Sequence, residues 1–265
     1  MTSATATTGS AERWGPRWGS RAADWAATEE QQLPTYEEAL RRLGVRGGTR
    51  VLEVGCGSGV FLRAAADRGA DVSGLDASPA LIDLARARVP EADLRVGDLQ
   101  LLPYEDDAFD LVAGFNAFFF ADDLVAALRE AGRVAKPGCP VVIQVWGRHE
   151  RCDLDAIKPL VRPYFPGYDP DAQPPPDLFA PGVLEGVVSA AGLTPKDAYD
   201  VSWAYVYEDG DALLRGLLAA GGVGEAAGPN GDELRAGLLE ALAPFRDGEG
   251  GYRLENEWHT LIATA

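Results

Sequence analysis

The amino-acid sequence predicts an α/β fold with a doubly wound, mostly parallel sheet, and a strand followed by a glycine turn is the first observation behind it. Residues 51–54 are largely apolar and β-branched, which is typical of a buried parallel strand. Three glycines follow within five positions, at Gly55, Gly57 and Gly59. They predict a sharp turn into a helix over about 60–68, whose N-terminal N–H groups would face a nucleotide-type ligand.

Two further strands that end in carboxylates are the second observation. Residues 71–76 predict a strand ending in Asp76, roughly 20 positions after the first glycine, where doubly wound folds place a ribose acceptor. The pair Ser78–Pro79 then predicts the cap and the first residue of a helix. A third strand within 94–99 carries Asp98. Because parallel strands end at the same edge of a sheet, we expect these groups to converge there.

The glycine spacing distinguishes between two kinds of ligand. A dinucleotide fingerprint would need a glycine at the sixth position, where Val60 stands, so a nicotinamide oxidoreductase is disfavoured. The pattern that remains is E-x-G-x-G-x-G, with Glu53 just before the turn. It resembles motif I of the class I S-adenosylmethionine-dependent methyltransferases, and in particular small-molecule methyltransferases with a type 11-like domain.

The resemblance implies that the cofactor is S-adenosylmethionine, and it assigns roles to individual residues. Glu53 would act near the cofactor's amino group through water, and the glycine turn would approach its amino-acid portion. Asp76 would bind both ribose hydroxyls, Asp98 would face the adenine amino group, and the N–H of Leu99 would meet a ring nitrogen. The cofactor-binding residues predicted in this way are Trp18, Trp25, Glu53, Gly55, Cys56, Gly57, Gly59, Asp76, Ala77, Ser78, Gly97, Asp98, Leu99 and Asn116.

The resemblance also implies a Rossmann-like, seven-stranded sheet whose last strand is antiparallel. Hydrophobic patterns after the third strand predict further strands at 109–116, 141–146, 200–207 and 252–264. They predict helices at 28–43, 121–134, 182–191, 211–220 and 232–242. The turn R-V-A-K-P-G at 133–138 is similar to one that these methyltransferases carry before strand five.

The domain organisation follows from these elements. We expect an N-terminal tail and helical lid over residues 1–45, and a methyltransferase domain over 46–265. A cap insertion after strand five would occupy about 147–181, where prolines stiffen a long connection at the edge that holds the ligand.

Three tryptophans lie close together ahead of the predicted core: Trp14, Trp18 and Trp25. Segments of the form W-G-x-x-A-x-D-W occur before motif I in small-molecule methyltransferases, where they form a lid over cofactor and substrate. An N-terminal helix that only covers the sheet would use the same aromatic cluster, so both interpretations stay open. Residues 1 to about 12 are small and polar, and we expect them to be disordered.

Composition and charge limit the classes of function. The chain has 265 residues, 46% of them hydrophobic, which fits one sizeable α/β domain with an appended cap. A net charge of −17 repels a nucleic-acid backbone, so nucleic acid is a poor substrate and a small molecule is expected. The three cysteines lack CxxC spacing, which argues against a metal site or a disulfide framework. Without a signal peptide or a membrane-spanning run, we expect a cytoplasmic protein.

The predicted function is the transfer of a methyl group to an O, N or C atom of a small, hydrophobic metabolite. Such a displacement depends mostly on proximity and orientation, so it requires no single diagnostic catalytic residue. The N/D-P-P-Y motif of amino-methylating nucleic-acid and protein enzymes is absent, because Ala117 and the aromatic run 118–120 follow Asn116. Those rings would belong either to the core or to an apolar substrate pocket.

One variant of this function remains open, and a second is disfavoured. A protein with the same fold can bind the cofactor and catalyse a non-methylating reaction, such as a cyclisation or a decarboxylation. A metal-dependent oxygen methyltransferase would need clustered acidic ligands, which Asp122 and Asp123 alone do not supply.

His149 is the candidate general base. It follows strand five and begins the cap insertion, and an unperturbed imidazole could accept the proton that a hydroxyl or amine loses. The alternative is that residues 148–151 form a solvated, charged loop. The second histidine, His259, lies within the last strand and is expected to be structural.

Overall fold

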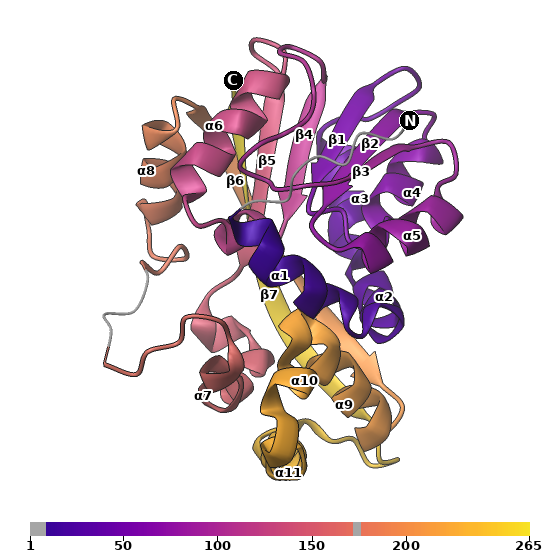
Figure 1. Ribbon diagram of the computed structural model, residues 1–265, viewed down its shortest axis with the longest axis vertical. Helices are drawn as coiled ribbons and strands as arrows, with labels where there is room; N and C mark the ends of the chain where they lie inside the picture. The colour runs from indigo at the N-terminus through magenta and orange to yellow at the C-terminus, as the bar shows by residue number, and fades with distance from the viewer. Residues whose placement is uncertain (1–8, 172–175) are drawn as a thin grey trace.

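A seven-stranded sheet forms the centre of the computed structural model, which describes residues 9–171 and 176–265 (Figure 1). The strand order is β3-β2-β1-β4-β5-β7-β6. The strands are β1 (Arg50–Val54), β2 (Asp71–Asp76), β3 (Asp93–Val96), β4 (Leu111–Phe115), β5 (Pro140–Trp146), β6 (Thr194–Tyr207) and β7 (Tyr252–Thr264). Strands β1 to β5 pair in parallel, whereas β7 is antiparallel to both of its neighbours. The predicted fold class is therefore confirmed.

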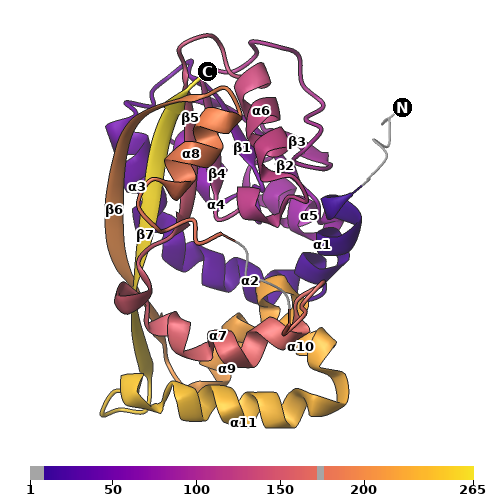
Figure 2. The same cartoon turned by 90° about the vertical axis from the view of Figure 1, so that its left-hand side faces the viewer.

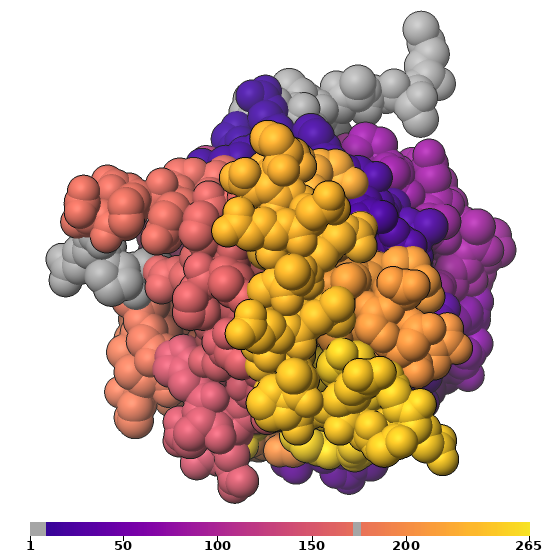
Figure 3. All heavy atoms as spheres, turned by 90° about the horizontal axis from the view of Figure 1, so that it is seen from below, coloured from indigo at the N-terminus to yellow at the C-terminus, as the bar shows by residue number. Residues whose placement is uncertain are grey.

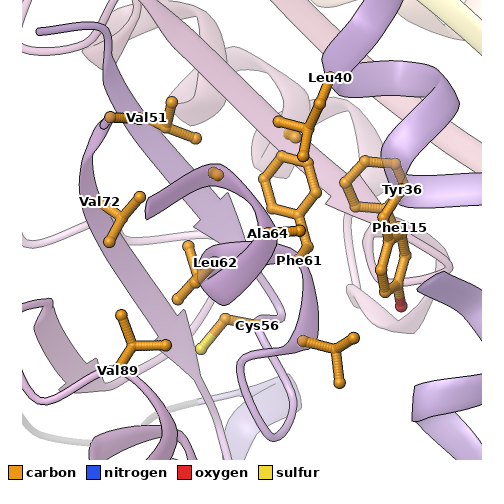
Figure 4. Packing of buried hydrophobic residues seen from close by; sticks show 14 of the residues in the cluster. Tyr36, Leu40, Val51, Cys56, Phe61, Leu62, Ala64, Val72, Val89 and Phe115 are labelled. Carbon is orange, nitrogen blue, oxygen red and sulfur yellow. The ribbon is translucent and has the colours of Figure 1, made fainter. Parts of the chain in front are cut away.

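Helices cover both faces of the sheet. They are α3 (Leu33–Arg42), α4 (Val60–Ala66), α5 (Pro79–Arg88), α6 (Leu124–Val134) and α8 (Val183–Ala190). Strand residues alternate between two cores: Val51 packs with α3, α4 and α5, while Leu52 packs with α6 and α8. In the first core the rings of Phe61 and Phe115 lie 4.7 Å apart, beside Tyr36 (Figure 4). This packing holds the glycine turn firmly against the sheet.

A second helical layer lies beyond the carboxyl edge of the sheet. It contains α1 (Ser10–Gly19), α2 (Ala22–Glu29), α7 (Lys158–Val161), α9 (Gly210–Ala219), α10 (Val223–Ala227) and α11 (Gly231–Ala241). Short 3-10 turns lie between helices and strands along the chain, at Glu30–Gln32, Phe118–Phe120, His149–Arg151, Asp153–Ile157, Arg162–Tyr164, Ala220–Gly222, Gly228–Asn230 and Ala243–Phe245. Seen from below, the C-terminal helices lie beside the insertion that follows β5 (Figure 3).

A two-stranded ribbon carries this layer. Along β7, strand β5 pairs with residues Trp258–Thr264 alone. Strand β6 pairs with the whole of β7, down to the pair formed by Tyr207 and Tyr252. The two long strands therefore continue past the rest of the sheet, as Figure 2 shows. The third hydrophobic core, centred on Trp258, fills the space between this ribbon and helices α9 to α11.

Three predicted boundaries are wrong for identifiable reasons. The helix expected at 28–43 is broken between Glu29 and Leu33, because Pro34 favours the start of a new helix. Strand β6 begins at Thr194 rather than at 200, and its first residues are mostly exposed and lack an apolar pattern. Helix α1 begins at Ser10, so disorder to residue 12 was wrong, while 1–8 lie outside the described residues.

The Trp258 side chain offers a test of the ribbon. It is fully buried, and its ring stacks on Trp146 with 5.4 Å between centroids. We expect Trp258→Ala to lower the free energy of unfolding by about 3–5 kcal/mol, because the third core loses its largest side chain. Trp203 on β6 is 45% exposed, so Trp203→Ala should cost less than about 1 kcal/mol. Urea denaturation of both variants measures the difference, and equal losses would contradict this account of the ribbon.

Candidate active site

A cavity of about 550 Å³ opens at the carboxyl edge of the sheet, between the strand ends and the second helical layer. This size is typical of a small-molecule site. Its upper half is lined by the glycine turn and by the ends of β2 and β3. In the turn, Gly55, Gly57 and Gly59 have φ angles of 75°, 51° and 81°, a region that L side chains rarely adopt. The glycine spacing is thus required by the backbone.

The structure brings most of the predicted cofactor residues together. Those that line the cavity are Trp18, Trp25, Gly55, Gly57, Asp76, Ala77, Gly97, Asp98, Leu99 and Asn116. The other four lie behind it. Cys56 is buried within the first core, Gly59 packs against Ala85, and the hydroxyl of Ser78 caps α5 by accepting a hydrogen bond from the N–H of Leu81 at 3.3 Å.

Glu53 is the fourth of these residues, and it is almost completely buried. One carboxylate oxygen, Oε2, has no hydrogen-bond partner in the described part of the chain. Burial, together with the nearby Glu29 and Asp76 carboxylates, raises its pKa well above the usual range. A buried polar atom without a partner is costly, so this position favours a hydrogen-bond donor.

Asp76 ends β2 at the floor of the cavity. Its carboxylate accepts hydrogen bonds from the backbone N–H of Gly57 at 3.0 Å and of Ser78 at 2.8 Å. Burial raises its pKa, although these backbone hydrogen bonds act in the opposite direction. The two bonds fix the carboxylate in the orientation needed to receive a polar group from the cavity.

Asp98 joins the sheet to the N-terminal helices. Its carboxylate accepts hydrogen bonds from the hydroxyl of Ser10 at 2.9 Å and from the N–H of Ala11 at 2.8 Å. The Asp98 carboxylate therefore caps the N-terminus of helix α1, the helix end that favours a negative charge. Farther along α1, Arg17 donates to the carbonyl oxygens of Gly221 at 2.9 Å and of Tyr164 at 2.6 Å. These contacts tie α1 to the C-terminal helices and to the insertion after β5.

Aromatic rings close the cavity on the side of α1. Trp18 lies 4.6 Å from Trp25 and 5.5 Å from Phe120 between ring centroids, and Trp14 lies 4.7 Å from Phe120. In the run 118–120, Phe118 is a core residue, whereas Phe119 and Phe120 line the cavity. The core interpretation therefore holds for Phe118, whereas Phe119 and Phe120 lie where a substrate pocket would require them.

Glu29 is a cavity residue that the sequence analysis missed. It ends α2, is 3% exposed, and accepts a hydrogen bond from the N–H of Ser58 at 2.8 Å. A Cβ atom on Gly57 would lie 2.7 Å from its carboxylate oxygens. Burial raises the pKa of Glu29 to about 7. An acidic residue inside a predicted amphipathic helix gives no signal of such a role.

The strand end at Asn116 is also polar and constrained. Asn116 has a φ angle of 53°, and its Nδ2 atom donates to Oε1 of Gln32 at 3.4 Å. Its Oδ1 atom is buried and has no partner among residues 9–171 and 176–265. Gln32 was not predicted either, because it comes from the turn between α2 and α3.

The lower half of the cavity is mostly apolar. It is lined by Trp146, Leu154, Ile157, Val161, Phe165, Tyr205, Tyr207, Leu217 and Val223. Among the described cavity residues Lys158 alone is cationic, and its ammonium group lies 2.5 Å from a carboxylate oxygen of Asp155. This half therefore suits an apolar molecule better than an anion.

His149 does not belong to the cavity lining. Its Nδ1 atom lies 2.6 Å from Asp155 and 3.2 Å from the ammonium group of Lys158, and its side chain is 54% exposed. The base prediction is not supported by this placement, since the ring is held in a surface cluster of charges. His259 pairs with Asp200 at 2.7 Å on the β6–β7 edge.

The structure gives no sign of a metal centre in the part of the chain that it describes. There, no group of three or more His, Cys, Asp or Glu side chains is placed to hold a metal ion. None of the described helices has the length and apolar character that crossing a membrane requires.

The fold and the carboxylate-rich edge beside the glycine turn define a Rossmann-like protein that binds a nucleoside-containing cofactor. Residues 52–143 match the methyltransferase domain family. An uncharacterised protein of Mycobacterium tuberculosis is 30% identical over 190 residues, which are 66% of this chain and 68% of that protein. The malonyl-[acyl-carrier protein] O-methyltransferase of Serratia marcescens is 35% identical over 120 residues, 45% of this chain and 47% of that enzyme.

Solved structures show the same fold. A chain of the Haloferax volcanii complex between the Trm112 methyltransferase activator and a methyltransferase superposes with a TM-score of 0.61, at 22% identity, covering 92% of this chain and 96% of that one. The [4+2]-cyclase SpnF superposes with a TM-score of 0.58, at 23% identity, covering 88% and 80%. The chain belongs to the class I S-adenosylmethionine-dependent methyltransferases, and S-adenosylmethionine is its cofactor.

The buried acids beside the glycine turn predict an unusual pH dependence of stability. The pKa of Glu29 rises from 4.5 to about 7, so the folded state holds this proton more tightly than the unfolded state. The stability gained in this way is complete below pH 4.5 and is lost as the pH rises through 7. We expect the melting temperature of the cofactor-free protein to fall between about pH 5 and 8.

Glu29→Gln tests the source of this slope, because glutamine imitates the protonated carboxyl. The variant should match the wild type at low pH and exceed it at pH 8 by on the order of 3 kcal/mol. Glu37→Gln is the matched control, since that side chain is exposed on α3. Thermal unfolding of the three proteins at several pH values provides the measurement. Parallel curves for all three would contradict the assignment to Glu29.

Proposed function

We propose that this chain transfers the methyl group of S-adenosylmethionine to an O, N or C atom of a small, hydrophobic molecule. One observation carries the proposal: a single cavity joins the carboxylate-rich edge at the glycine turn to an apolar half with no free cation among its described residues. The names of several relatives agree with it. They include a ubiquinone biosynthesis O-methyltransferase and a demethylmenaquinone methyltransferase, of which this chain spans about half, 49% in each case.

The upper half fits the cofactor residue by residue. Asp76 would hold the ribose hydroxyls, because its carboxylate is already oriented by two backbone N–H groups. Asp98 and Leu99 would meet the adenine, and the glycine turn would face the amino-acid portion. The buried, unpartnered oxygen atoms of Glu53 and Asn116 beside the turn fit a ligand with several hydrogen-bond donors. The bound cofactor supplies a methyl group activated on sulfur.

The chain's own contribution to the reaction would be positioning and the exclusion of water. Helices α1 and α2 cover the cavity, and Arg17 fastens α1 to the opposite wall. We propose that the described residues of the predicted lid, 9–45, cover the site, and that those of the insertion, 147–171 and 176–181, form the acceptor half with the C-terminal helices. A closed, apolar site holds the acceptor near the methyl group and removes competing water, which can supply most of the rate.

A second candidate is a non-methylating reaction in the same cavity. Two observations are compatible with this candidate: the fold is similar to that of the [4+2]-cyclase SpnF, and His149, the predicted general base for methyl transfer, lies outside the cavity. The two candidates differ in their products. A cyclisation or decarboxylation leaves S-adenosylmethionine intact, whereas methyl transfer converts it to S-adenosylhomocysteine.

Product mass therefore tests the proposed function. Incubation of the protein with S-adenosylmethionine and a panel of neutral, ring-containing phenols, amines and carbon acids should give a product heavier by one methylene unit. S-adenosylhomocysteine should form in equal amount. An acceptor that reacts without any S-adenosylhomocysteine would support the second candidate instead.

Asp76→Ala tests the cofactor half. We expect it to weaken S-adenosylmethionine binding by tenfold or more in calorimetry, since charged hydrogen bonds contribute about 1.5–3 kcal/mol each. Asp71→Ala is the control, because Asp71 begins the same strand and its side chain is exposed. Unchanged affinity in Asp76→Ala would remove the ribose assignment.

A further inference from the structure

Two carboxylates from different elements occupy neighbouring N–H groups of the glycine turn. Asp76 accepts from Gly57, and Glu29 accepts from Ser58, the next residue in the chain. Asp76 belongs to the sheet, whereas Glu29 belongs to the N-terminal helix α2. A Cβ atom on Gly57 would displace the Glu29 carboxylate from this position. A side chain there would therefore disturb this contact in addition to the strain of the positive φ angle.

The sheet order fixes where Glu29 lies along the cofactor. Strands β3, β2 and β1 are neighbours in that order, so Asp98, Asp76 and the glycine turn follow one another across the edge of the sheet. A cofactor with its adenine at Asp98 and its ribose at Asp76 extends its amino-acid end over the turn after β1. Glu29 lies on that turn and lines the cavity there.

The charge around Glu29 is unbalanced. Glu29, Glu53 and Asp76 are 3%, 2% and 9% exposed. The Asp76 carboxylate raises the pKa of Glu29, and the carboxylates of Glu29 and Asp76 both raise the pKa of Glu53. The Arg88 guanidinium on α5 lowers the pKa of Glu29, but it is bound to the exposed Glu30 at 2.8 Å. A cation bound beside these acids would favour their charged forms, and the Oε2 atom of Glu53 has no hydrogen-bond partner among the described residues.

We propose that Glu29 binds the α-ammonium group of S-adenosylmethionine, so that the N-terminal lid closes on the amino-acid end of the cofactor. This inference rests on the proposed use of the cavity by a methyltransferase and adds a residue to it. Because α2 carries both the lid tryptophan Trp25 and Glu29, cofactor binding and lid closure become one event.

Three ligands separate this role from its alternatives. S-adenosylmethionine and S-adenosylhomocysteine both carry the ammonium group, and only the first carries a charged sulfur. Methylthioadenosine lacks the amino-acid end altogether. Glu29→Gln keeps an oxygen acceptor for the N–H of Ser58 and removes the charge. Glu37→Gln again serves as the matched control, because Glu37 is exposed and outside the cavity lining.

Calorimetry should show that Glu29→Gln binds the first two ligands at least tenfold more weakly and binds methylthioadenosine within about twofold of the wild type. Equal losses for all three ligands would overturn the proposal, since they would indicate a misplaced helix. Tighter binding would also overturn the proposal. It would indicate that Glu29 occupies the N–H of Ser58 only in the free protein and that the carboxylate of the cofactor displaces it.

A proton-linkage measurement gives independent evidence. The groups that act on Glu29 or that it acts on are Asp76, Glu53, Cys56, Tyr36, Tyr205 and Arg88. Burial raises the pKa of Glu29 to about 7, and a bound ammonium group would lower it. S-adenosylhomocysteine binding should therefore release a proton near pH 7 and tighten from pH 6 to 8 in the wild type, but not in Glu29→Gln. The same proton release in both proteins would contradict the proposal.

These outcomes are distinct from a failure of the proposed function. A wild-type protein that bound neither S-adenosylmethionine nor S-adenosylhomocysteine would remove both proposals together. A wild-type protein that bound both and produced a methylated product, with Glu29→Gln binding equally well, would remove only the role of Glu29.

Discussion

The hydrogen-bonding capacity of one short turn organises this molecule. Three glycines with positive φ direct the N–H groups of residues 57 and 58 into the cavity, and carboxylates from β2 and α2 accept from them. The first of these bonds holds the end of the sheet, and the second holds the N-terminal helices. Because both depend on the same backbone, the floor and the roof of the cavity are positioned by a single element.

Most of the fold could be predicted from the sequence because the central strands are buried on both faces and the glycine turn has a fixed spacing. The errors occur where local pattern and tertiary contact differ. The start of β6 is exposed and carries Lys196 and Asp197, so no apolar alternation marks it. Helix α1 begins at Ser10 because the carboxylate of Asp98, 88 positions away, accepts its first hydrogen bonds.

The residues of the candidate site also fall into those that the sequence predicts and those that only the tertiary structure identifies. Asp76 and Asp98 follow strands directly, so their place at the carboxyl edge is a consequence of the parallel sheet. Glu29 and the apolar half come from helices whose sequences resemble ordinary amphipathic helices, and only the tertiary structure shows which of their residues face inward. His149 follows β5 as a base would, but its ring is drawn to Asp155 and Lys158 at the surface.

The ribbon of β6 and β7 separates two parts of the molecule that can change independently. The upper half of the cavity belongs to strands at the centre of the sheet, whereas most of the lower half belongs to the insertion and to helices carried by the ribbon. If the lower half binds the acceptor as proposed, substitutions on those helices would alter its shape and leave the cofactor contacts in place. Selection could then exchange one substrate for another in this scaffold without rebuilding the part that binds S-adenosylmethionine.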